Sequence, residues 1–173
     1  MNRQIYLRAF EPEDYKTIVN WRNDREIAQK LGGGISYFSA EREKKWVLDT
    51  IYGHGDVKLA ICLREDNSHI GNVYLTGINY INRTAESHIM IGDKSCWGKG
   101  YGGEALMEIL TYGFNELGLN RIEARINADN TASLRLHQKI GYRREGVLRE
   151  AIYKNGRYKD VIVMSILKEE LIE

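Results

Sequence analysis

The chain has 173 residues, and its 25 basic and 24 acidic residues leave a formal net charge of +1 at pH 7, so we expect a single domain over residues 1–173. This balance excludes the general electrostatic attraction with which proteins bind nucleic acids or anionic membranes, and any charged ligand must be bound locally. No apolar run approaches the roughly 20 residues of a membrane span, and MNRQIYLRAF at the N-terminus has no apolar signal segment, so we expect a cytoplasmic protein.

The first 52 residues predict one strand and two helices. Residues 4–10 alternate between apolar and polar side chains, as a strand does, and residues 11–24 follow with Pro12 at a helix-opening position and acidic residues in the first turn. Residues 30–38 are glycine-rich and predict a flexible loop. Ser39 is a suitable N-cap for a second helix over residues 40–52.

The middle of the chain predicts an antiparallel meander. Residues 57–64, 69–81 and 85–92 are apolar segments with strand-like composition, and the short polar turns EDNS and NRT separate them.

A dense glycine segment, CWGKGYGGEA at residues 96–105, comes next. It leads directly into residues 105–117, whose apolar residues recur at helical spacing, so a glycine loop opens a helix. A helix N-terminus presents unpaired N–H groups and the positive end of the helix dipole. We therefore expect a phosphate or diphosphate group to bind at this loop.

Two nucleotide-binding patterns can be compared with the glycine segment. The Walker pattern fails, because Lys99 is followed by Gly100 rather than by Ser or Thr. The dinucleotide pattern G-x-G-x-x-G fits Gly98, Gly100 and Gly103, and Glu123 follows twenty residues later. That pattern belongs to repeated βαβ units with the loop near the domain start, whereas here the loop follows a predicted meander. The order of the elements therefore disfavours a dinucleotide.

The chain after the loop predicts a crossover and a short helix. Residues 121–127 form a strand that is reached through a helix, so this strand should lie parallel to residues 85–92. Residues 130–140 predict a short helix that Gly141 ends as the C′ residue.

The C-terminal segments, residues 147–154 and 157–167, flank Asn155-Gly156, which is a strong hairpin signal. Together these elements predict an α/β (α+β) fold, with a mixed, mostly antiparallel sheet of about seven strands and about four helices.

The cysteines and histidines lack the spacing of metal ligands. Cys62 and Cys96 form no C-x-x-C pattern, and none of the four histidines forms an H-x-x-x-H pair with another. We expect neither a metal site nor a disulfide framework.

Two segments resemble the motifs of the GNAT superfamily of acyl-CoA-dependent N-acetyltransferases. WGKGYG at residues 97–102 resembles its signature loop, which reads Arg or Gln, two residues, Gly, any residue, then Gly or Ala. NTASLRLHQKIGY at residues 130–142 resembles its later motif, an Asn with a downstream Gly-aromatic pair. The order of elements agrees along the whole chain. NWRND and FSAEREKKW are similar to the branch with ribosomal-protein N-terminal and spermidine acetyltransferases.

The resemblance implies a GNAT-like fold and acetyl-CoA as cosubstrate. The loop amides of residues 98–103 would hold the CoA diphosphate, and the pantetheine arm would pair with the strand at residues 89–91. Trp97 departs from the family, because many members carry Arg or Gln there and so place a cation or a side-chain donor at the diphosphate. The implied cofactor-binding residues are Ile89, Met90, Ile91, Trp97, Gly98, Lys99, Gly100, Tyr101, Gly102, Gly103 and Asn130.

Acetyl transfer to an amine requires a neutral nitrogen and a proton for the leaving thiolate. Strand alternation places Glu86, His88 and Met90 on one face, toward an acceptor cleft. Glu86 resembles the glutamate that many members have on this strand, and it is our leading general base. A solvated cross-strand charge is the alternative for Glu86. His88 is the second candidate base, or else a core histidine.

His137 stands where many family members have a tyrosine that resembles a general acid. It either protonates the sulfur or packs beside Leu134 on the same helix face. Asn130 is both an N-cap candidate and, by the resemblance, a CoA contact.

The resemblance implies an amine acceptor, on either a small molecule or a peptide. We expect the acceptor-binding side of the site to be lined by Tyr37, Phe38, Trp46 and the loop from Gly32 to Gly34. The absence of an acidic cluster there favours a protein N-terminus or a small primary amine over spermidine. A CoA-sensing or protein-binding module without catalysis is the alternative of another class. We expect no nucleic-acid or membrane partner, and allow a homo-oligomer.

Overall fold

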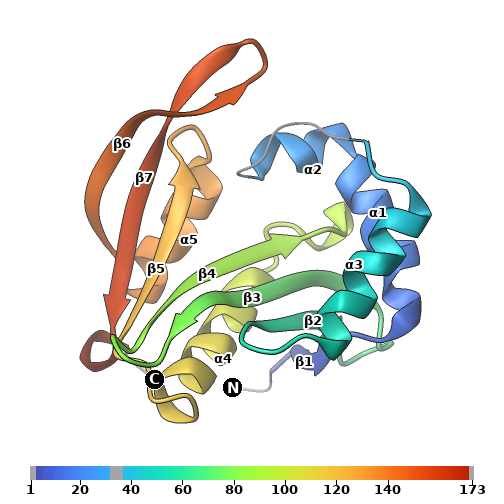
Figure 1. Cartoon of the computed structure of the whole chain (residues 1–173), viewed down its shortest axis with the longest axis horizontal. Helices are drawn as coiled ribbons and strands as arrows, with labels where there is room; N and C mark the ends of the chain where they lie inside the picture. The colour runs from blue at the N-terminus through green and yellow to red at the C-terminus, as the bar shows by residue number, and fades with distance from the viewer. Residues whose placement is uncertain (1–2, 32–36, 172–173) are drawn as a thin grey trace.

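The computed structural model describes residues 3–31 and 37–171. Its strands form one seven-stranded sheet in the order β1-β2-β3-β4-β5-β7-β6 (Figure 1). Only β4 and β5 are parallel, and the other neighbouring strands are antiparallel. The predicted mixed sheet and its parallel pair are therefore confirmed. The strands are β1 (Ile5–Ala9), β2 (Val57–Leu63), β3 (His69–Asn79), β4 (Thr84–Ile91), β5 (Arg121–Asn127), β6 (Arg143–Lys154) and β7 (Arg157–Leu167).

The described residues form five α-helices: α1 (Tyr15–Asn23), α2 (Arg25–Lys30), α3 (Ala40–Tyr52), α4 (Tyr101–Asn115) and α5 (Thr131–Ile140). Ser39 caps α3 as predicted, because its side chain accepts a hydrogen bond from the N–H of Arg42. The sequence analysis did not predict α2. Asp24 has an extended backbone that ends α1, and its side chain accepts from the N–H groups of Glu26 and Ile27 to start α2.

The predicted loop over residues 30–38 is wrong at its start, because Lys30 is the last residue of α2. Residues 32–36 lie outside the described part of the chain.

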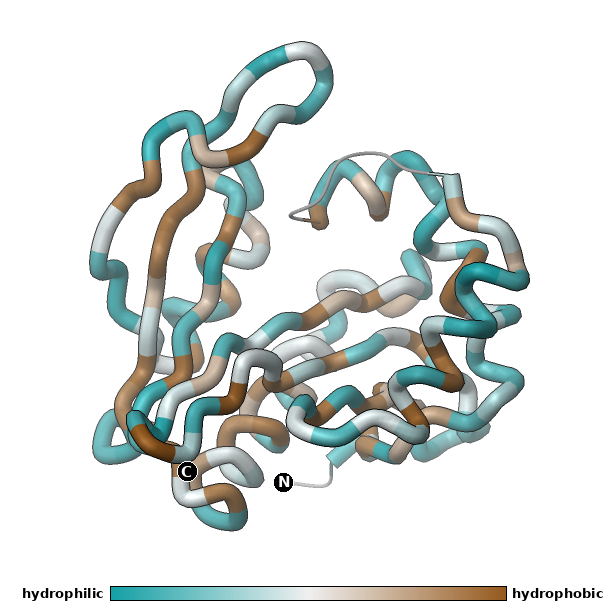
Figure 2. Tube along the Cα trace, in the orientation of Figure 1, coloured by the Kyte–Doolittle hydropathy of each residue, from teal (hydrophilic) through white to brown (hydrophobic). Residues whose placement is uncertain are grey.

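Helices cover both faces of the sheet, and strand alternation explains how. In β2, Ala60 and Cys62 join a buried cluster with residues of α1, α2 and α3, whereas Ile61 joins the larger core with α4. Figure 2 shows apolar residues recurring along the strands and polar residues at the β6–β7 turn. At that turn Asn155 and Gly156 both have positive φ, 54° and 76°, as a type I′ turn requires.

The sheet divides between β4 and β5. The two strands share only three residue pairs, and Glu86 opposite Glu123 is the last of them. Beyond it the strands diverge toward α2, which Figure 1 shows as an opening between the two halves of the sheet. At the point of divergence Ser87 is buried, and its hydroxyl donates to the Glu123 carbonyl at 3.2 Å and lies 2.7 Å from the Tyr142 hydroxyl.

Within the described residues, no helix combines the length and the apolar character that crossing a membrane requires.

Candidate active site

The glycine loop opens α4 with a backbone that only glycine adopts readily. Gly98 and Gly100 have φ values of +74° and +90°, and Gly100 is the N-cap of α4. A Cβ atom at either glycine would have no heavy atom within 4 Å, so the backbone here borders open space. Gly102 and Gly103 lie in the first turn of α4, where a Cβ atom on either would meet Leu136 of α5 at 3.6 Å, an ordinary contact distance. The loop is thus accessible to a ligand at a helix N-terminus.

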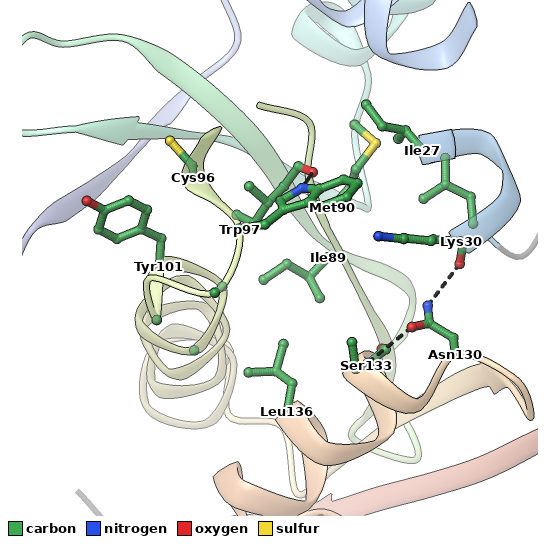
Figure 3. A pocket seen from close by; sticks show the side chains of 17 residues that line it. Ile27, Lys30, Ile89, Met90, Cys96, Trp97, Tyr101, Asn130, Ser133 and Leu136 are labelled. Carbon is green, nitrogen blue, oxygen red and sulfur yellow. Dashed lines mark hydrogen bonds between the residues drawn. The ribbon is translucent and has the colours of Figure 1, made fainter. Parts of the chain in front are cut away.

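A cavity of about 420 Å³ extends from this loop along the C-terminal half of β4, between α5 and α2 (Figure 3). Ten of the eleven predicted cofactor-binding residues line it, and the eleventh, Lys99, is exposed and is absent from the described lining. The CoA-binding roles of these residues stay predictions. The lining residues that the sequence analysis missed are Ile27, Lys30 and Leu31 of α2, Ala132, Ser133 and Leu136 of α5, and Cys96.

The chemistry of the residues that line this cavity suits acetyl-CoA. A helix N-terminus with a glycine loop suits the diphosphate, and the apolar channel beside Ile89 and Ile91 suits the pantetheine arm. Trp97 closes one side of the channel, and its indole N–H donates to the Ile91 carbonyl at 2.8 Å.

Asn130 connects α5 with the end of α2, on two sides of the cavity. Its side-chain oxygen accepts from the N–H of Ser133, which confirms the predicted N-cap of α5, and its amide N–H donates to the Lys30 carbonyl at 3.0 Å (Figure 3).

Glu86 and His88 lie two residues apart on β4 and so share one face of the strand, and neither is among the described residues lining the first cavity. Glu86 lines a second cavity of about 220 Å³ beside the paired part of β4 and β5. Its carboxylate lies 3.8 Å from the His88 ring and 3.9 Å from the Arg125 guanidinium. Glu86 therefore stands where the two halves of the sheet meet.

His88 is held by the Thr76 hydroxyl, 2.8 Å from its Nε2 atom. Burial disfavours the charged ring and lowers the pKa of His88. The nearby Glu86 carboxylate partly offsets this effect.

The carboxylates beside Glu86 are firmly paired with arginines. Arg121 contacts Glu123 at 3.2 Å and Glu145 at 2.6 Å. Hydrogen bonds from Arg121 and then from Ser165 lower the pKa of Glu145 to about 2. These acids are therefore poor candidates for a base compared with Glu86.

His137 is buried, with 2% of its surface exposed, and it is absent from the described lining of the first cavity. Its Nδ1 atom lies 2.8 Å from the Ser133 carbonyl, which can only accept, so Nδ1 carries the proton. Burial lowers the pKa of His137, although the Ser133 carbonyl opposes the shift. The ring also packs edge-on against Tyr142. This geometry favours the packing alternative, and a proton-donor role stays a prediction.

The aromatic residues expected to line the acceptor-binding side of the site do not all lie together in the structure. Trp46 packs with Tyr74, which in turn lies beside His88, so these rings lead toward Glu86. Phe38 and Trp46 hold the Arg22 guanidinium between them at 4.7 and 4.9 Å. Tyr37 is almost fully exposed. The expected glycines at positions 32–34 lie outside the described residues.

Glu43 of α3 is an acid that the sequence analysis missed. Only 1% of it is exposed, and its carboxylate lies 3.4 Å from Arg22. Burial raises the pKa of Glu43, and Arg22 and Arg42 oppose that shift.

Comparison with known proteins agrees with this geometry. Residues 4–143 match the acetyltransferase (GNAT) domain family. The chain is 32% identical over 177 residues to the spermidine N(1)-acetyltransferase of Vibrio cholerae serotype O1, covering 99% of this chain and 98% of that protein. It is 31% identical over 171 residues to the uncharacterized N-acetyltransferase p20 of Bacillus licheniformis, covering 96% and 94%.

A solved structure is also similar. The crystal structure of spermidine N-acetyltransferase from Vibrio cholerae in complex with CoA and spermine aligns with a TM-score of 0.90 at 31% identity, covering 98% of each chain. The protein described here therefore belongs to the GNAT acetyltransferase family.

Proposed function

We propose that this acetyltransferase moves the acetyl group of acetyl-CoA directly to the primary amine of a small molecule. The proposal depends on one observation above all: Glu86 is the last residue of β4 paired with β5, at the start of the opening that separates the two halves of the sheet. The first cavity borders the C-terminal half of β4, and the Glu86 carboxylate borders the second cavity, nearer the start of that strand.

In this reaction the chain has three tasks. The glycine loop and the α4 N-terminus bind the diphosphate, and the divergent part of β4 holds the pantetheine arm. Glu86, directly or through water, takes a proton from the acceptor ammonium, because only a neutral amine nitrogen can attack the thioester carbonyl. The new C–N bond replaces the C–S bond, and the leaving thiolate takes up a proton.

The charges beside Glu86 support a small amine over a polycation. Glu86 has Arg125 nearby, Glu123 is paired with Arg121, and the buried Glu43 is paired with Arg22. Arginine thus already pairs with Glu123 and Glu43, so these two carboxylates add little attraction for a second or third ammonium group.

An acceptor panel tests this proposal. Butylamine, spermidine, and a peptide with either a free or a blocked N-terminus would be incubated with acetyl-CoA, and thiol release and product mass would be measured. We expect acetylation of butylamine and none of the blocked peptide. Turnover of the free peptide alone would contradict a small-molecule acceptor.

A polyamine is the second candidate, and the similarity to spermidine N(1)-acetyltransferase over nearly the whole chain favours it. Butylamine and spermidine share an aminobutyl group but differ in charge. A kcat/KM for spermidine more than about 100-fold above that for butylamine would correspond to roughly 3 kcal/mol of recognition of the additional amines and would establish the polyamine.

The expected cytoplasmic location stays a prediction that cell fractionation would test. Light scattering would show whether the chain forms the homo-oligomer that the sequence allows.

A further inference from the structure

The first cavity, which we propose binds acetyl-CoA, is lined almost entirely by uncharged residues. Lys30, at the C-terminal end of α2, is the only charged residue among the described residues that line it. Figure 3 shows its side chain entering the cavity with the ammonium group toward Trp97, and the Nζ atom lies 3.4 Å from the centre of the Trp97 ring. The ammonium group therefore lies beside the residue that begins the glycine loop.

The Trp97 side chain has no free donor for a phosphate, because its indole N–H is already bonded to the Ile91 carbonyl, and the backbone N–H of Trp97 donates to the Lys94 carbonyl. Lys99, the lysine within the loop, is exposed and is not among the described lining residues. Lys30 is thus the side chain best placed to contribute a cation at this end of the cavity.

The backbone around Lys30 is fixed by side chains distant in the sequence. Asn130 donates to the Lys30 carbonyl, Asn127 donates to the Leu31 carbonyl at 3.1 Å, and the buried Lys154 donates to the carbonyls of both Ala28 and Leu31. These bonds satisfy carbonyl groups at the end of α2 that lack helical partners. They hold α2 across the cavity from the glycine loop.

The ammonium group itself remains available. Its carboxylate neighbour is Glu26 at 3.9 Å, but Glu26 has a closer partner in Lys94 at 2.9 Å. With 48% of its side chain exposed, Lys30 can exchange the Trp97 ring for a stronger anionic partner without first losing a tight ion pair.

We propose that Lys30 binds the diphosphate of CoA and supplies, from α2, the positive charge that Trp97 does not supply from the loop. The proposal rests on the use of acetyl-CoA but not on the identity of the acceptor. A direct ammonium–phosphate contact is a charge-assisted hydrogen bond, and the flexible lysine stem spans the cavity from a fixed helix end.

Calorimetric titration with CoA, without any acceptor, tests this. Lys30→Met keeps the apolar stem but removes the charge, so we expect its Kd for CoA to rise about 10-fold, as loss of one charged hydrogen bond implies. Lys30→Arg should remain within about 3-fold of wild type, since it retains the charge. Lys139→Met is the matched control, because Lys139 is exposed on α5 and is absent from the described lining.

The second measurement uses S-acetylpantetheine, which carries the thioester but no diphosphate. A diphosphate contact predicts that Lys30→Met leaves kcat/KM with this donor unchanged. An unchanged Kd for CoA, or an equal loss with both donors, would overturn the proposal and leave Lys30 as a structural contact to Trp97. Failure of the amine proposal would appear separately, as tight CoA binding without acetylation of any small amine.

Discussion

Glu86 of β4 and Glu123 of β5 lie side by side as the last residue pair before the two parallel strands separate. The two carboxylates have different surroundings. Glu123 lies 3.2 Å from a guanidinium nitrogen of Arg121 and 3.5 Å from one of Arg125, whereas Glu86 lies 3.9 Å from a guanidinium nitrogen of Arg125. The same position in the sheet thus holds one acid in contact with two arginines and one acid with a single, longer arginine contact.

Replacing Glu86 by Gln should therefore lower kcat by about 10²- to 10⁴-fold, the usual contribution of a general base. The Kd for CoA should change little, since Glu86 is not among the described residues that line the first cavity. Steady-state kinetics and calorimetry provide the two values.

Glu123→Gln is the matched comparison for Glu86→Gln. Because arginines already pair with Glu123, we expect less than about a tenfold loss of kcat. Equal losses in the two variants, or a wild-type rate for Glu86→Gln at neutral pH, would remove Glu86 as the base and make His88 the candidate.

Charge at the glycine loop gives a second prediction. Gly100→Asp should abolish CoA binding, because a carboxylate at the α4 N-cap would repel the diphosphate. Gly100→Asn has nearly the same shape and tolerates positive φ, so it separates charge from backbone strain. We expect measurable CoA binding by the Asn variant, and thermal melting would show that both variants fold. Equal binding by the two variants would place the diphosphate elsewhere.

Asp14 should control stability in acid. Burial alone raises its pKa, but two hydrogen bonds from Arg8 and one from the N–H of Glu11 outweigh that and hold the pKa of Asp14 well below its usual value. A depressed folded pKa stabilises the fold above the unfolded pKa near 4, and this contribution disappears as the pH falls through the folded value.

Asp14→Asn should accordingly lower the free energy of unfolding by roughly 2 kcal/mol at pH 7. In urea denaturation the difference between the variant and wild type should shrink steadily below pH 4. A difference that stays constant down to pH 2 would mean that packing, and not the ionised carboxylate, accounts for the effect.

His137 can be tested through the pH profile of kcat. A neutral ring whose Nδ1–H donates a hydrogen bond to the Ser133 carbonyl predicts that His137→Phe keeps most of the wild-type kcat above pH 7, because the ring volume beside Tyr142 is retained. If His137 instead protonates the thiolate, the wild-type alkaline limb should move upward in His137→Tyr, since tyrosine keeps its proton to higher pH. Superimposable profiles of all three proteins would remove His137 from the mechanism.

Local signals in the sequence predicted the elements that local chemistry determines. Asn155-Gly156 specified its hairpin, Ser39 its helix start and Gly141 its helix end, and each acts through its own backbone or its nearest neighbours. The glycine segment likewise predicted the loop before α4. These positions require no knowledge of the rest of the chain.

The missed features depend on distant contacts. Helix α2 has six residues, too short for a periodic pattern, and its end is stabilised by Asn130 and Lys154, about 100 and 126 residues away from their partners. Glu43 lies in the charged segment EREKK, a pattern typical of a solvent-exposed helix face. In the structure it is buried and lies 3.4 Å from Arg22 of another helix. Asp24 followed by Glu26 was the one local sign of α2.

The most direct test of the proposed function is the stoichiometry of one reaction, with purified protein, acetyl-CoA and butylamine. We predict one CoA thiol released for each acetylated amine formed, and loss of both signals together in Glu86→Gln. Thiol release without acetylated amine, or CoA binding without turnover of any amine in the panel, would contradict direct acetyl transfer to a small primary amine.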